Sequence, residues 1–207
     1  MAKAVASPPK LILASASAAR RGMLERAGVA FEVKPAEIDE RAVQDVLIGD
    51  DSEVEPADVA ELLAEAKARD VSERNPGALV IGSDQVLEFE DEILSKPEDI
   101  AQARAALKLL RGSTHHLHAG VAIALDGEVA WSMVDSASLT MRQFSDKFLA
   151  SYIAEEGDSL CSSVGAYKLE GRGLQLFERI DGDFFTILGM PLLPLLIELR
   201  ARGVIAT

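Results

Sequence analysis

The segment ALVIGSDQVLEFE, Ala78 to Glu90, decides the fold, because a carboxylate interrupts a run of residues that is typical of a protein core. Residues 78–82 are apolar or small and follow the turn sequence NPG, which predicts an interior strand that ends near Gly82. An ionised aspartate in apolar surroundings is costly unless it has a partner. We therefore expect Asp84 at the end of this strand, where it either reaches solvent or meets a cation.

The composition is that of an ordinary globular protein, and 207 residues suffice for one sizeable core. We expect a single domain over residues 1–207, with two lobes around a central cleft. The formal charge of −13 disfavours nucleic-acid polymers and anionic membranes as partners, although a local cationic pocket can still hold a small anion. One cysteine, Cys161, fits a reducing compartment, and no segment approaches the ~20 apolar residues of a membrane span. These features predict a cytoplasmic protein.

Strands and helices alternate along the chain, which predicts an α/β fold. We expect strands at 11–14, 31–34, 78–82 and 165–180, a hairpin over 114–140 with its turn at Asp126-Gly127, and helices at 18–27, 57–71, 98–111, 145–155 and 191–203. In the helix over 57–71, the apolar residues Val59, Leu62, Leu63 and Ala66 recur at helical spacing and predict its buried side. Lys67 is then expected on the polar side.

Polar residues gather where the first strand passes into the first helix, namely Ser15, Ser17, Arg20 and Arg21. Free backbone N–H groups and the helix dipole favour a bound anion at such a position, and phosphate is the obvious candidate. The alternative is that Ser17 only caps the helix and that the arginines face water.

Three further polar features have both a functional and a surface interpretation. Lys96 follows the short strand EILS, and Pro97 stiffens the turn in a way that fixes the direction of the lysine. The acidic run PAEIDE contains Glu40, which can supply a carboxylate to a metal, although such runs are often only surface in an acidic chain. Lys67 has the same two interpretations. The compact order of all these residues favours a site.

Four segments resemble the Maf (septum formation protein) family of nucleoside triphosphate pyrophosphatases, from about Lys10 to Gly203. They are LILASASAARRGMLERAGVAFEVKPAEIDE, VIGSDQVLEFEDEILSKP, LRGSTHHLHAGVAI and SVGAYKLEGRGLQLFERIDGDFFTILGMPLLPL. The resemblance implies an elongated mixed sheet flanked by helices, like that of the inosine triphosphate pyrophosphatases, and a homodimer. It also implies hydrolysis of the α–β phosphoanhydride of a nucleoside triphosphate to monophosphate and pyrophosphate, with a divalent metal, Mg²⁺ or Mn²⁺.

The resemblance gives roles to six residues, which are Ser15, Arg20, Glu40, Lys67, Asp84 and Lys96. Asp84 would be the general base or the metal-bound carboxylate that prepares a water for attack at phosphorus, and Glu40 would help to hold the metal. Ser15 belongs to the phosphate-binding loop. Arg20, Lys67 and Lys96 would neutralise the triphosphate and the charge that develops on the departing pyrophosphate.

Three positions depart from the commonest family pattern and bear on the choice of substrate. They are Ala19, where the loop loses its first arginine; Gln85, where threonine is usual; and Glu170, where many members have glutamine. The segments GSDQV, KLEG and LFER resemble the 7-methyl-GTP pyrophosphatase branch, which commonly has a tryptophan at the position of Ala19. A carboxylate can accept from the N–H donors of a guanine edge and complements the cationic ring of 7-methylguanine, so we expect Glu170 to read the base.

Two other functions stay open from the sequence. One is a nucleotide-binding regulator of cell division without catalysis, and the other is a pyrophosphatase that prefers dTTP or UTP. Retention of Glu40, Asp84 and Lys96 favours an enzyme, since a sensor needs no water-activating acid. His116 and His118 share one strand face, but no third ligand accompanies them, so we expect a structural role instead of a zinc site.

Overall fold

The computed structural model describes residues 9–47 and 54–206. The predicted domain over 1–207 therefore includes three segments, 1–8, 48–53 and 207, that lie outside the described residues. Within the described part, no helix combines the length and the apolar character needed to cross a membrane.

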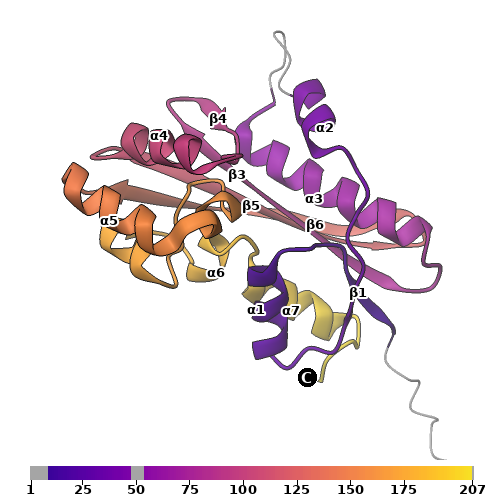
Figure 1. The fold of residues 1–207 in the computed structure, drawn as a ribbon. Coiled ribbons are helices and arrows are strands. Elements are labelled where there is room, and N and C mark those ends of the chain that lie inside the picture. The colour runs from indigo at the N-terminus through magenta and orange to yellow at the C-terminus, as the bar shows by residue number, and fades with distance from the viewer. Residues whose placement is uncertain (1–8, 48–53, 207) are drawn as a thin grey trace, which may run out of the picture.

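A mixed sheet with helices on both faces forms the centre of an elongated molecule (Figure 1), which confirms the predicted fold class. Its strand order is β2-β1-β3-β5-β6-β7, and β4 pairs with the outer part of β3. β1 pairs in parallel with β2 and β3, whereas the other pairs are antiparallel. The strands are β1 (Leu11–Leu13), β2 (Glu32–Val33), β3 (Leu79–Phe89), β4 (Glu92–Leu94), β5 (Thr114–Leu125), β6 (Glu128–Met141) and β7 (Phe177–Asp181).

Several helices begin at a side-chain cap. The side chains of Ser17, Asp99 and Ser145 each accept a hydrogen bond from a backbone N–H in the first turn of their helix. The helices are α1 (Ala18–Arg26), α2 (Glu40–Leu47), α3 (Pro56–Glu73), α4 (Ile100–Leu110), α5 (Asp146–Glu156), α6 (Phe184–Ile187), α7 (Leu192–Ala201) and the 3₁₀ turns η1 (Gly157–Ser162) and η2 (Arg172–Leu176). The sequence interpretation missed α2 in the acidic region before Pro56.

The hairpin of β5 and β6 forms as predicted. Its turn residues Asp126 and Gly127 have φ values of 51° and 84°, which suit the tight turns that match the twist of the strands. The register runs from Leu125 opposite Glu128 to Thr114 opposite Thr140. The two long strands therefore extend the sheet along the whole molecule.

Two predicted strand boundaries are wrong. The strand expected to end near Gly82 continues to Phe89, so Asp84 lies inside β3, opposite Gly120 of β5. The strand continues because alternating residues up to Phe89 bury against both faces of the sheet. The strand predicted over 165–180 is mostly turn and 3₁₀ structure, because Ala166 has φ of 55° and only Phe177–Asp181 pairs with β6.

Two hydrophobic clusters lie on the face opposite α3. The first, cluster 1, joins α4 and α5 to the outer ends of the long strands and includes Leu87, Leu107, Leu117, Leu139, Leu149 and Tyr152. The second, cluster 2, joins α1 and α7 to the other end of the sheet and includes Leu13, Met23, Ile81, Val121, Leu195 and Leu199. β3 and β5 contribute residues to both clusters, and Asp84 lies in the part of β3 between them.

Candidate active site

Asp84 meets a cation, which is one of the two outcomes expected from the sequence. Its Oδ1 atom lies 2.5 Å from Nζ of Lys67 on α3, and the two side chains are only 10% and 7% exposed. Alternation along β3 turns Asp84, like Val86, toward α3. A buried aspartate is thus paired with a buried ammonium group, which offsets the cost of removing both charges from water.

The prediction that Lys67 lies on the polar side of its helix is wrong. Two glycines explain why α3 can bring this lysine onto the sheet. A Cβ atom at Gly82 would lie 2.0 Å from the carbonyl oxygen of Ala64, and one at Gly120 would lie 2.2 Å from that of Ala60. The backbone of α3 therefore rests directly against β3 and β5, and Lys67 comes within reach of Asp84.

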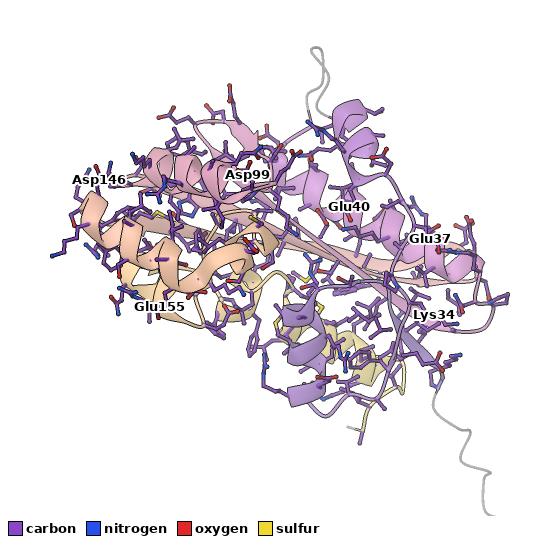
Figure 2. The ribbon with its side chains drawn as sticks, viewed as in Figure 1. Lys34, Glu37, Glu40, Asp99, Asp146 and Glu155 are labelled. Atoms are coloured by element: carbon purple, nitrogen blue, oxygen red, sulfur yellow. The ribbon has the colours of Figure 1, made fainter. Side chains whose placement is uncertain are left out.

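Glu40 is the second carboxylate on this ammonium group. It is the first residue of α2, where Figure 2 labels it. Its Oε1 atom lies 2.9 Å from Nζ of Lys67. Its side chain is 58% exposed, so Lys67 bridges a buried and an exposed carboxylate. The other acids of the same run have other partners, since Asp39 accepts from the backbone N–H of Ala42 and Glu37 pairs with Arg74.

The edge of β3 beside Asp84 is open between two paired segments. β1 pairs with β3 as far as Ile81, and β4 pairs with it from Leu87 onward. Among the described strands, none pairs with residues 82–86 on that edge. The loop that leaves β1 at Ser15 and the turn that leaves β4 toward Lys96 therefore border the same stretch of strand.

Arg20 is the cation that α1 brings to this place. Its Nε–H donates to the carbonyl oxygen of Gly189 at 2.8 Å, and an Nη1–H donates to Oγ of the buried Ser15 at 3.4 Å. Burial lowers the pKa of Arg20, whereas the negative charges of Asp84 and Glu40 act to raise it. Ser17 caps the helix as the alternative interpretation held, but Arg20 points inward.

Arg21 differs from its neighbour, because it forms an exposed pair with Glu25, at 2.7 Å. Of the two arginines near this loop, Arg20 contacts Ser15 and Arg21 does not. The binding of phosphate by Ser15 and Arg20 stays a prediction.

Lys96 is exposed and lies two residues beyond the last pair of the β3–β4 hairpin, Leu87 opposite Leu94. If that register continued, Lys96 would stand opposite Gln85, next to Asp84. Within the described part of the chain, Lys96 forms no hydrogen bond or ion pair. It is therefore a cation free to meet a ligand at the open edge.

The three positions expected to choose the substrate have different surroundings. Gln85 points to the face opposite Asp84, where its Nε2 group donates to the carbonyl oxygens of Thr186 and Ile187 at 2.9 and 3.1 Å. Ala19 is partly buried in α1. Glu170 is exposed in the turn between η1 and η2, and the structure does not bring it into contact with Lys67 or Asp84. Its role stays a prediction.

Sequence reasoning did not single out Ser83 and Gly189. The Gly189 carbonyl accepts both from Arg20 and from the hydroxyl of Ser83, the latter at 2.9 Å. Gly189 has φ of 103°, and a Cβ atom there would lie 3.4 Å from the Arg20 guanidinium and 3.6 Å from Oε1 of Gln85. The glycine in the segment TILGMP was the sequence signal that the backbone has a special conformation at this position.

The residues present fit a divalent metal that also binds substrate. Among the described residues, no group of three or more His, Cys, Asp or Glu side chains could hold a metal by itself. Asp84 and Glu40 offer two hard carboxylate groups, and Mg²⁺ is commonly held by one or two carboxylates together with substrate phosphates. His118 has another role, because it bonds Glu88 and Ser136 across the sheet, at 2.7 Å each. The expected structural role of this histidine fits these contacts.

Together, the fold and the site define an α/β enzyme whose polar centre lies at an open edge of an inner strand. The chain belongs to the family described as Maf-like protein, whose model matches residues 10–202. It is 53% identical over 191 residues to a 7-methyl-GTP pyrophosphatase of Brucella abortus, and the aligned residues make up 92% of this chain and 95% of that protein.

Two further proteins are similar to the chain. A nucleoside triphosphate pyrophosphatase of Paramagnetospirillum magneticum is 50% identical over 192 residues, with 93% of this chain and 98% of that protein covered. A solved structure of a dITP/XTP pyrophosphatase from Mycobacterium abscessus aligns with a TM-score of 0.42 at 14% identity, over 94% of this chain and 95% of that one.

Proposed function

We propose that the protein hydrolyses the α–β phosphoanhydride of nucleoside triphosphates to a nucleoside monophosphate and pyrophosphate, with 7-methyl-GTP as its substrate. The observation that carries this proposal is the buried Asp84, joined through Lys67 to Glu40 and bordered by Arg20. The names of the two relatives, both pyrophosphatases, support the reaction class, and the Brucella relative, a 7-methyl-GTP pyrophosphatase, supports the substrate.

Each side chain has a chemical task in this reaction. Asp84 accepts a proton from the water whose oxygen attacks the α-phosphorus, while the bond to the bridging oxygen breaks and pyrophosphate leaves. Lys67 fixes the direction of Oδ1 of Asp84 by direct contact. Arg20 and Lys96 neutralise the phosphate charges, including the charge that grows on the leaving group.

A divalent cation, Mg²⁺ or Mn²⁺, would be held by Asp84 and Glu40 together with the triphosphate. When bound, it would neutralise phosphate charge and bring substrate and water to the same carboxylates. Glu40 suits this task because it is exposed and belongs to the first turn of α2, whereas Asp84 is fixed by its strand.

Release of pyrophosphate from 7-methyl-GTP, GTP, UTP and dTTP, measured with Mg²⁺ and with Mn²⁺, tests the proposal. We expect the highest kcat/KM with 7-methyl-GTP and a loss of about 100-fold or more in kcat for Asp84→Asn, because general base catalysis is worth about that much. Normal turnover by Asp84→Asn would remove it from the role of base.

The same panel separates the other functions. A preference for UTP or dTTP would replace the proposed substrate, and binding without any pyrophosphate release would favour the regulator. If Glu170→Gln leaves the order of the four substrates unchanged, Glu170 does not read the base.

We also propose that the protein acts in the cytoplasm as a homodimer. The single cysteine supports a reducing compartment. The exposed Leu193 and Ile197, one turn apart on α7, support a contact with a second copy. Light scattering on the eluting protein measures the mass directly, and a monomer at micromolar concentration would contradict the dimer.

A further inference from the structure

Three residues form a row across the sheet on the face opposite α3. Gln85 of β3 stands opposite Ala119 of β5, which stands opposite Asp135 of β6. Side chains in such a row point to the same face. The central Ala119 is small and fully buried, which leaves room for another element above it.

Thr186 of α6 occupies the space above this row and contacts both ends of it. Its hydroxyl donates to Oδ2 of Asp135 at 2.6 Å, and its carbonyl oxygen accepts from Nε2 of Gln85 at 2.9 Å. Thr186 is fully buried, so water does not reach its hydroxyl to compete for the bond to Asp135. Asp183 caps the same short helix by accepting from the backbone N–H groups of Phe185 and Thr186.

The turn that follows Thr186 contacts both Gln85, which is expected to bear on the choice of substrate, and Arg20, which is expected to bind phosphate. Ile187 accepts the second hydrogen bond of the Gln85 amide group, and Gly189 accepts from Nε of Arg20. Both hydrogens on Nε2 of Gln85 thereby bond to carbonyl oxygens. This fixes which end of the side-chain amide is the nitrogen and leaves Oε1 available as an acceptor. A substrate base that reaches Gln85 therefore meets a fixed acceptor.

We propose that Asp135 and Thr186 are positioning residues, which hold the turn 186–189 so that Gln85 presents its oxygen and Arg20 keeps its direction. This inference rests on the proposed function, because it gives these directions a purpose in substrate choice and phosphate binding. Neither residue touches the substrate; each acts through the carbonyl groups of the turn.

A positioning role and a merely structural role predict different kinetics. If the bond of Thr186 to Asp135 only stabilised the fold, its loss would reduce the amount of active enzyme. The apparent kcat would then fall by one factor for every substrate, with KM unchanged. If the bond positions Gln85 and Arg20, its loss raises KM and changes the ratio of kcat/KM between 7-methyl-GTP and UTP.

The decisive variant is Thr186→Val, which keeps the shape of the side chain and removes the hydroxyl. We expect KM for 7-methyl-GTP to rise about tenfold, as for the loss of one hydrogen bond to a charged group, and the substrate ratio to move toward one. Thr186→Ser restores the donor and should restore both quantities. Thr140→Val is the matched control. It also removes a threonine hydroxyl, one whose Oγ1 atom lies 2.9 Å from Oγ1 of Thr114 at the exposed end of the hairpin.

A second measurement does not depend on turnover. The side-chain amide signals of Gln85 in a ¹⁵N correlation spectrum should be slow to exchange with solvent in the wild type and in Thr186→Ser, and fast in Thr186→Val. Asp135→Ala removes the acceptor at a partly exposed position and should give the same change if the valine variant does not fold.

The outcomes distinguish the two levels of the proposal. A wild-type protein that releases no pyrophosphate would overturn the proposed function, while the amide signals would still decide whether Asp135 and Thr186 position Gln85. Active wild type with an unchanged substrate ratio, an unchanged KM and an equally protected amide in Thr186→Val would overturn the positioning role alone.

Discussion

At the scale of single residues, the site depends most on Lys67. Its ammonium group contacts a buried carboxylate, Asp84, at 2.5 Å and an exposed one, Glu40, at 2.9 Å. Charges buried as a pair are tolerated because each compensates the other, and removing one partner leaves the other uncompensated. Lys67 is therefore expected to support both the stability of the protein and the direction of its proposed base.

Replacement of this lysine by methionine separates these effects. Lys67→Met should lower the free energy of unfolding by about 3–5 kcal/mol, because Asp84 is left buried without its cation. The double variant Lys67→Met, Asp84→Asn removes the uncompensated charge and should recover most of that loss. Urea unfolding of the wild type and of the two variants measures both values. A single variant as stable as the wild type would show that the pair contributes nothing.

The burial of Lys67 could have been predicted from its helix, but the apolar stripe was placed incorrectly. The buried positions of α3 are Val59, Ala60, Leu63, Ala64, Lys67, Ala68, Val71 and Ser72. Lys67 is four residues from both Leu63 and Val71, on the buried stripe. Leu62, which the sequence interpretation used, is 38% exposed. A lysine at a core position of the helical repeat was the available signal for a buried cation.

At the scale of elements, the site depends on how closely α3 approaches the sheet. Gly82 and Gly120 are the two contact points, and Gly120 stands directly opposite Asp84. Alanines at Ala64, Ala68, Ala122 and Ala124 continue the close contact toward the other end of the helix. Small residues on both elements thus set the separation that lets Lys67 reach Asp84.

Gly120→Ala tests this dependence. The added Cβ atom would lie 2.2 Å from a backbone carbonyl of α3, so the helix must move. We expect a loss of about 1–3 kcal/mol of stability, as for overpacking of a core, and a fall in kcat because Lys67 is carried away from Asp84. Thermal unfolding and pyrophosphate release measure the two effects.

Gly22→Ala is the control for this substitution. A Cβ atom at Gly22 would meet only the flexible end of Arg26, at 3.0 Å, and alanine is favoured over glycine in a helix by roughly 0.5–1 kcal/mol. This variant should be as stable as the wild type or more so, with normal kcat. Equal behaviour of the two variants would mean that the separation of α3 from the sheet does not matter.

Elements with strong local signals were predictable, and those decided by distant contacts were not. The Asp126-Gly127 turn and the start of the helix at Ser145 were predicted correctly, since turn and cap chemistry are local. The continuation of β3 past Asp84 was not, because it requires pairing with β5, 36 residues away at Gly120. The contact of Gly189 with Arg20 is equally remote and has no local pattern.

At the scale of the whole molecule, two clusters lie at opposite ends of the same long strands. Leu87 of β3 and Leu117 of β5 belong to cluster 1, whereas Ile81 and Val121 of the same strands belong to cluster 2. If one cluster unfolded while the other stayed folded, the pairing of β3 with β5 would have to break in the middle, near Asp84. We therefore propose that the chain unfolds as the single domain expected from its length.

His115 gives a way to disturb one cluster only. It lies against Tyr167 and Phe177 of cluster 1, its Nε2 atom contacts the hydroxyl of Tyr167 at 2.7 Å, and its Nδ1 atom has no partner among the described residues. Burial lowers the pKa of His115 from 6.5 to about 4, and the neighbouring His116 adds to the shift. The unfolded chain thus binds this proton more readily than the folded one does.

The pH dependence of stability follows from this sign. The contribution of neutral His115 is complete above pH 6.5 and is lost as the pH falls toward about 4, amounting to roughly 3 kcal/mol when complete. His115→Gln cannot take up a proton, so the stability of the wild type relative to this variant should fall over that interval. The comparison cancels the carboxylates that titrate in both proteins.

The single tryptophan makes this a test of the whole molecule. Trp131 packs against cluster 2, at the other end of the sheet from His115. If the chain is one cooperative unit, urea unfolding at pH 5 should give the same midpoint by Trp131 fluorescence and by circular dichroism, and both midpoints should shift together relative to His115→Gln. A fluorescence midpoint that ignores the protonation of His115 would show that the two clusters unfold separately. The site between them would then lie on a hinge, and Asp84 could not owe its fixed position to the continuity of β3.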